Sequence, residues 1–124
     1  MIKAEQTMEW QHLTTENQLA EAIRNSTQKP VLLFKHSTRC SISKTTLDRL
    51  ERNWKTNDNQ VIEPYFLDLL SYRPISNLIA ENLNIEHESP QAIVLFNQKV
   101  VYHASHFDIN YQQILASASA VATN

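Results

Sequence analysis

The sequence contains no glycine, a single cysteine and no long apolar run. Tight turns that need a positive φ angle therefore fall to other residues, and we expect them at Asn57-Asp58-Asn59 and at Asn97-Gln98. The absence of glycine excludes a glycine-rich phosphate-binding loop. A single cysteine excludes an internal disulfide, so the fold depends on packing alone, as is usual in a reducing compartment.

Charge and hydropathy exclude further classes of protein. The formal net charge of -2 is too small to favour nucleic acid or a membrane surface as a partner. No apolar run approaches the roughly 18 residues of a transmembrane helix, and the first residues lack the apolar segment of a signal peptide. With 124 residues, we expect one domain, monomeric and cytoplasmic, in which residues 1–13 form an arm or a short edge strand.

One stretch, residues 31–44, organises the chain. Its first four residues form an apolar run that predicts a short strand buried on both faces. Beyond it, apolar residues recur every three or four positions and predict a helix from about Cys40 to Lys55. The unpaired amides of the first helical turn, together with Arg39 and Lys44, favour the thiolate form of Cys40. An inert, buried cysteine is the alternative that position and charge leave open.

Helices and strands alternate along the rest of the chain. Thr15 and Gln18 fit a capping box that begins the first helix. The other predicted elements are a loop at 56–60, a strand at 61–69 that begins at a sheet edge because of Pro64, a helix after Pro74, a hairpin of 92–96 with 100–104, and a last helix capped by Asp108. The order α, β, α, β, α, β, β, α predicts an α/β sandwich.

Local motifs connect this order of elements to a family. The signature segments of the monothiol bacilliredoxins, which are bacterial thioredoxin-like proteins that use the thiol bacillithiol, resemble two stretches of this chain, Lys35-His36-Ser37-Thr38-Arg39-Cys40-Ser41-Ile42-Ser43 and His87-Glu88-Ser89-Pro90-Gln91. Residues 72–77 are also similar to the family, and the resemblance begins at about Trp10. The family often has proline where this chain has Ser41. The resemblance implies a thioredoxin-like α/β fold, with a central mixed β-sheet of about four strands flanked by helices on both faces.

The resemblance also implies roles for particular residues. Cys40 matches the redox cysteine and Pro90 the cis-proline of the fold, while Ser43 stands where dithiol relatives have a resolving cysteine. The Ser43 hydroxyl is expected to donate a hydrogen bond to the Cys40 thiolate. No metal or tightly bound cofactor is expected; bacillithiol is the expected co-substrate, and bacillithiol-modified proteins are the expected partners. The residues expected to bind substrate are Thr38, Arg39, Ser41, Ile42, Ser43, Ser89 and Pro90.

Three functions are compatible with these residues. The resemblance implies thiol-disulfide exchange in which Cys40 removes bacillithiol from protein mixed disulfides. A thioredoxin-like module without catalysis, holding a partner in the groove of Cys40 and Pro90, is the alternative. The pH dependence of Cys40 alkylation distinguishes these two. An iron-sulfur carrier is the third reading; it needs an external thiol as a ligand, and residues 40–43 do not match the motif of such carriers.

The histidines have mostly ordinary interpretations. His103 and His106 are expected to be surface or half-buried residues and not metal ligands, because no second cluster completes a site. His87 lies in the loop of Pro90, from which contact with a ligand carboxylate is a minor alternative. The sheet face to which His36 points is undecided from the sequence.

Overall fold

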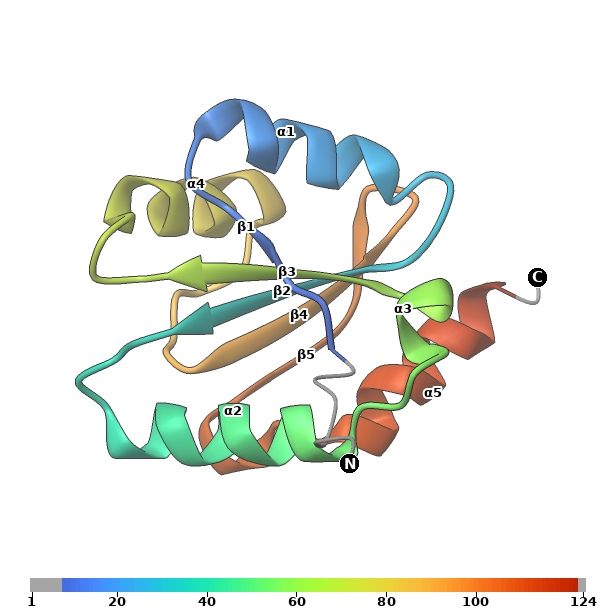
Figure 1. Ribbon diagram of the computed structural model, residues 1–124. Helices are drawn as coiled ribbons and strands as arrows, with labels where there is room; N and C mark the ends of the chain where they lie inside the picture. The colour runs from blue at the N-terminus through green and yellow to red at the C-terminus, as the bar shows by residue number, and fades with distance from the viewer. Residues whose placement is uncertain (1–7, 123–124) are drawn as a thin grey trace.

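A five-stranded mixed sheet, in the order β1-β3-β2-β4-β5, forms the centre of the protein (Figure 1). The structure is a computed structural model that describes residues 8–122. β1 and β2 are parallel to β3, whereas β4 is antiparallel to β2 and β5. In chain order the elements are β1 (Gln11–His12), α1 (Glu16–Asn25), β2 (Val31–His36), α2 (Ser41–Asn53), α3 (Asp58–Val61), β3 (Glu63–Asp68), α4 (Arg73–Leu83), β4 (Gln91–Phe96), β5 (Lys99–Ser105), the 3-10 helix η1 (His106–Asp108) and α5 (Tyr111–Ala122).

The predicted α/β architecture is confirmed, with one strand more than expected. The additional strand is β1, which pairs with Tyr65 and Phe66 of β3 at the edge of the sheet. Pro64 lies just before this pairing, so β3 begins at an edge, as its missing N–H group predicts. The prediction of an N-terminal arm or edge strand also covers residues 1–7, which lie outside the described residues.

Helices cover both faces of the sheet. α1 and α4 lie on one face and α2 and α5 on the other (Figure 1). Because successive residues of a strand point to opposite faces, Leu33 of β2 packs in the core under α1 and α4, and Phe34 packs in the core under α2 and α5. All six residues of β2 are buried, as the apolar run predicts for its first four. Within residues 8–122, no helix has the length and apolar character needed to cross a membrane.

The first helix begins as predicted and the last one does not. Thr15 and Gln18 form the capping box, in which each side chain accepts the other residue's backbone N–H at 3.1 Å. Asp108 was expected to cap the last helix, but it lies in η1. Asn110 takes this role, because its Oδ1 accepts the N–H of Gln113 at 2.9 Å. Because the 3-10 turn follows β5, α5 begins later in the chain than predicted, at Tyr111.

Two turns show how a chain without glycine reverses direction. Asn97 and Gln98 have φ angles of 55° and 65° and join β4 to β5, as predicted. The prediction of a positive φ at residues 57–59 is wrong, and the loop predicted at 56–60 contains α3. The Asp58 carboxylate accepts the Lys55 N–H at 2.8 Å, which stabilises the turn that leads into α3. β3 consequently begins at residue 63 and not at 61. The left-handed residues not predicted are Asn84 and His106.

Candidate active site

Cys40 lies at the junction of β2 and α2, where the sequence predicts it. It is half-buried and is the N-cap residue of α2, with extended φ and ψ angles of -108° and 119°. Its carbonyl accepts the Lys44 N–H at 3.1 Å, which is the first hydrogen bond of the helix. Within the described residues no side chain caps this end of α2. Cys40 is therefore at the end of α2 where amide groups lack intrahelical partners, and such a helix end favours negative charge.

The substrate-binding residues predicted around Cys40 differ in exposure. Thr38, Arg39 and Ser41 are exposed, and Ile42 is half-buried. These residues form the turn after β2 and the first turn of α2, so the chain itself brings them beside the thiol. Their contact with a substrate stays a prediction.

Ser43 is the member of this group that faces inward. Its side chain is fully buried, and its Oγ accepts the Ser37 N–H at 3.0 Å and lies 2.8 Å from Nδ1 of His36. The hydroxyl was expected to donate to the Cys40 thiolate. Among the described residues, its recorded partners are Ser37 and His36 instead. The reason is the strand before the thiol, because β2 ends with His36 on the face that α2 covers.

His36 is buried between the sheet and α2. Its ring lies 6.4 Å from the ring of Phe34 and 5.4 Å from that of Phe66, measured between centroids. Burial lowers the pKa of His36 from its ordinary 6.5, and the carboxylates of Asp68 and Glu51 oppose this shift. The imidazole is therefore neutral at pH 7, with one ring nitrogen as donor and the other as acceptor.

Pro90 lies at the same edge of the sheet as the end of β2. Gln91 pairs with Lys35 across β4 and β2, so the preceding residue, Pro90, lies beside the last residue of β2. Pro90 is buried and the Ser89–Pro90 peptide bond is cis, as the resemblance implies. Ser89 is half-buried, and its buried Oγ has no hydrogen-bond partner among the described residues. The fold thus brings Ser89 and Pro90 to the edge from which the Cys40 turn departs.

The sequence interpretation missed a partly buried polar cluster on the other face of the sheet, in which Lys35 and Ser76 are buried and His87 is exposed. Lys35 is fully buried, and its Nζ lies 3.1 Å from Nδ1 of His87 and 3.3 Å from the carbonyl oxygen of Ser76. Burial lowers the pKa of Lys35 to about 8. Burial also lowers the pKa of His87, and the nearby charges of Lys35 and Arg73 lower it further. Strand alternation was the available signal, because Lys35 lies on the same face as apolar Leu33.

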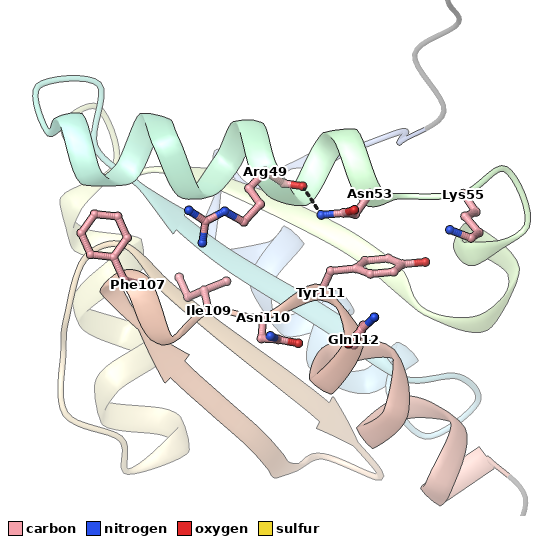
Figure 2. A pocket seen from close by; sticks show the side chains of 8 residues that line it. All are labelled: Arg49, Asn53, Lys55, Phe107, Ile109, Asn110, Tyr111 and Gln112. Carbon is pink, nitrogen blue, oxygen red and sulfur yellow. Dashed lines mark hydrogen bonds between the residues drawn. The ribbon is translucent and has the colours of Figure 1, made fainter.

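A separate cavity lies between α2 and the segment that leads into α5. Its volume is about 230 Å³, and Figure 2 shows Arg49 of α2 on one side of it and Phe107 and Tyr111 on the other. None of its eight lining residues is a predicted site residue. Among residues 8–122, no three His, Cys, Asp or Glu side chains come together in a way that could hold a metal ion.

Comparison with known proteins agrees with this arrangement. A proposed oxidoreductase with a thioredoxin fold is 31% identical, with a TM-score of 0.72 over 88% of this chain and 92% of that one. Thioredoxin from Malassezia sympodialis is 13% identical, with a TM-score of 0.72 over 96% of each chain. Thioredoxin from Trypanosoma brucei brucei is 11% identical, with a TM-score of 0.72 over 100% of this chain and 99% of that one. These likenesses establish the thioredoxin fold.

The match to a family covers most of the chain and points to redox activity. The family model described as monothiol bacilliredoxin BrxC matches residues 11–114, a range that includes β1, the Cys40 turn, Pro90 and the first part of α5. The chain therefore belongs to the monothiol bacilliredoxin family.

Proposed function

We propose that this protein is a thiol-disulfide oxidoreductase that removes bacillithiol from mixed disulfides with client proteins. The observation that supports this most directly is the position of Cys40, a half-buried thiol at the start of a 13-residue helix, beside the sheet edge that carries Pro90. The amide end of such a helix stabilises an attacking thiolate. Ser43 cannot act as a second thiol, so the exchange uses one cysteine of the protein.

The proposed exchange has two steps. The Cys40 thiolate attacks the bacillithiol sulfur of the mixed disulfide, the client sulfur leaves as a thiolate, and bacillithiol becomes disulfide-bonded to Cys40. The thiolate of a second bacillithiol then attacks the bacillithiol sulfur of that adduct. Cys40 is released as a thiolate and bacillithiol disulfide forms. The client sulfur is reduced to a thiolate, the second bacillithiol is oxidised, and the bacillithiol taken from the client leaves as the other half of bacillithiol disulfide. Cys40 returns to its starting state.

This proposal defines the surroundings that the protein needs. Bacillithiol is a co-substrate and bacillithiol-modified proteins are the partners, with no tightly bound cofactor. Exchange in the reducing direction requires a pool of free thiol, so we propose the cytoplasm as its location and a monomer as the working unit. Thr38, Arg39, Ser41 and Ile42 would contact the bound thiol because they surround Cys40.

The experiment is intact-mass analysis after incubation with bacillithiol disulfide, followed by release of bacillithiol from a labelled client protein. We expect wild type to gain one bacillithiol and to release the client, and Cys40→Ser to do neither. Ser119→Ala, a change at an exposed residue of α5, serves as the matched control and should behave as wild type. A wild-type chain that takes up no bacillithiol would overturn the proposal and leave the non-catalytic binding module as the alternative.

A second variant tests the one-thiol route. In Ser43→Cys, the new thiolate can attack the Cys40 sulfur of the adduct, forming an internal disulfide and releasing bacillithiol. We therefore expect the adduct to persist in wild type until free bacillithiol is added, and to disappear from Ser43→Cys without it. Spontaneous loss of the adduct from wild type would contradict a route that depends on a second bacillithiol.

A further inference from the structure

The Ser43 hydroxyl lies in a chain of buried polar contacts that ends one helical turn from the reactive thiol. Ser43 is the third residue of α2, and Cys40 is its N-cap. Side chains three residues apart on a helix are neighbours, so the side chains of Cys40 and Ser43 lie on the same side of the first helical turn. Whether the Ser43 hydroxyl can donate a hydrogen bond to Cys40 therefore affects how much of the thiol is ionised.

Counting protons shows that the hydroxyl has two possible states. It holds one proton and two lone pairs, and one lone pair accepts the Ser37 N–H. If Nδ1 of His36 has no proton, the hydroxyl donates to it across the 2.8 Å contact and has no proton left for a thiolate. If Nδ1 carries a proton, it donates to the hydroxyl, and the hydroxyl proton becomes available to the sulfur.

We propose that His36 is a positioning residue that acts on Cys40 through Ser43. In this proposal the neutral imidazole has its proton on Nε2, so Nδ1 accepts a hydrogen bond from the Ser43 hydroxyl. In the protonated imidazole Nδ1 is a donor, and the hydroxyl is then free to donate to the Cys40 thiolate. His36 thereby couples the reactivity of the thiol to pH. This inference extends the proposed function, because it rests on Cys40 as the reacting group.

Burial favours the neutral state of His36 at pH 7, and the two carboxylates that act on the imidazole oppose this effect. The imidazole is 5% exposed and lies against the rings of Phe34 and Phe66, so burial disfavours its charge. Asp68 is its register partner on β3, and one oxygen of that carboxylate is buried with no hydrogen-bond partner among the described residues. The charges that act on it from the packed elements are Asp68, which favours protonation, Glu51, which favours it, and Lys44, which opposes it.

The test is a double-mutant cycle read by the ultraviolet absorbance of the thiolate and by the rate of alkylation with iodoacetamide. His36→Phe keeps an aromatic ring in its place and removes the acceptor, so the Ser43 proton is free at every pH. Ser43→Ala removes the hydroxyl. A hydrogen bond to a charged group changes an equilibrium by about tenfold or more. We therefore expect His36→Phe to raise the thiolate fraction of Cys40 by about tenfold where that fraction is small, and to have no effect in the Ser43→Ala background.

The pH profile gives a second measurement that needs no change at His36. Wild type should show a second transition in alkylation rate below about pH 6.5, and Ser43→Ala should show only the thiol transition. Equal effects of His36→Phe with and without the Ser43 hydroxyl would overturn the inference, and so would identical pH profiles for wild type and Ser43→Ala. Neither measurement contains bacillithiol, so a wild-type chain that forms no bacillithiol adduct but shows this coupling would refute the proposed function and leave the inference standing.

Discussion

Lys35 gives the protein a dependence of stability on pH that can be calculated from the structure. Its ammonium group is fully buried, and burial lowers its pKa from 10.5 to about 8. Between these two pH values the unfolded chain binds one proton more than the folded chain, so the free energy of unfolding rises with pH. At about 1.4 kcal/mol per pH unit, the full window corresponds to about 3 kcal/mol. This stability is fully present above the pKa that Lys35 has in the unfolded chain. It is lost as the pH falls to and below the pKa of about 8 that Lys35 has in the folded chain.

Lys35→Met isolates this contribution, because methionine fills a similar space without a charge. At neutral pH the variant escapes a desolvation cost of about 3 kcal/mol and loses two contacts of about 1 kcal/mol each, to Ser76 and His87, so it should be about 1 kcal/mol more stable than wild type. Urea unfolding followed by the fluorescence of Trp10 and Trp54 measures this difference. When the measurement is repeated at about pH 9.5, the difference in free energy of unfolding between the two proteins should shift by about 2 kcal/mol in favour of wild type.

The comparison separates Lys35 from the other groups that titrate at high pH. The pKa values of Tyr102 and Tyr111 are raised, mainly by burial, so their ionisation opposes folding, but both proteins contain both tyrosines. Lys99→Met, a change at an exposed residue of β5, is the matched control and should show no shift against wild type over this pH range. A stability difference between wild type and Lys35→Met that stays constant from about pH 7 to about pH 9.5 would refute the reasoning.

Three further predictions test local features. Thr15→Ala removes the capping box of α1 and should lower the free energy of unfolding by about 1 kcal/mol in urea; an unchanged midpoint would contradict it. Gln98→Gly relieves a left-handed residue and should raise stability by about 1 kcal/mol, whereas destabilisation would show that the side chain matters. Asp58→Asn removes a negative charge beside Tyr111 and should lower its pKa from about 12 in a spectrophotometric titration; an unmoved phenolate transition would exclude this interaction.

The parts of the fold that could be predicted are those that a short stretch of sequence determines without contacts to distant segments. The capping box needs only Thr15 and Gln18, the hairpin turn needs only Asn97 and Gln98, and each behaves as predicted. The position of Cys40 follows in the same way, since the change from a strand period to a helix period occurs within one stretch.

The features that could not be predicted depend on contacts between distant segments. Residues 1–13 were expected to form an arm or a short edge strand, and the choice between the two depends on β3, whose free edge pairs with Gln11 and His12. Asp108 looked like a helix cap, but the 3-10 turn after β5 gives that role to Asn110. The partner of Ser43 depends on the face to which His36 points, and the sequence leaves that face undecided. Local propensity identifies a candidate in each case, and tertiary pairing decides the outcome.

The last two residues of β2 connect these observations, because neighbouring residues of a strand point to opposite faces. Lys35 contacts His87, three residues before Pro90, and His36 contacts Ser43, three residues after Cys40. Each half of the proposed site is thus connected to the same strand by a polar contact, buried at Ser43 and partly buried at His87. Such contacts depend on protonation, whereas apolar contacts do not. The Pro90 side should therefore respond to titration of Lys35 and His87, and the Cys40 side to titration of His36, so that a change in one pair leaves the other in place.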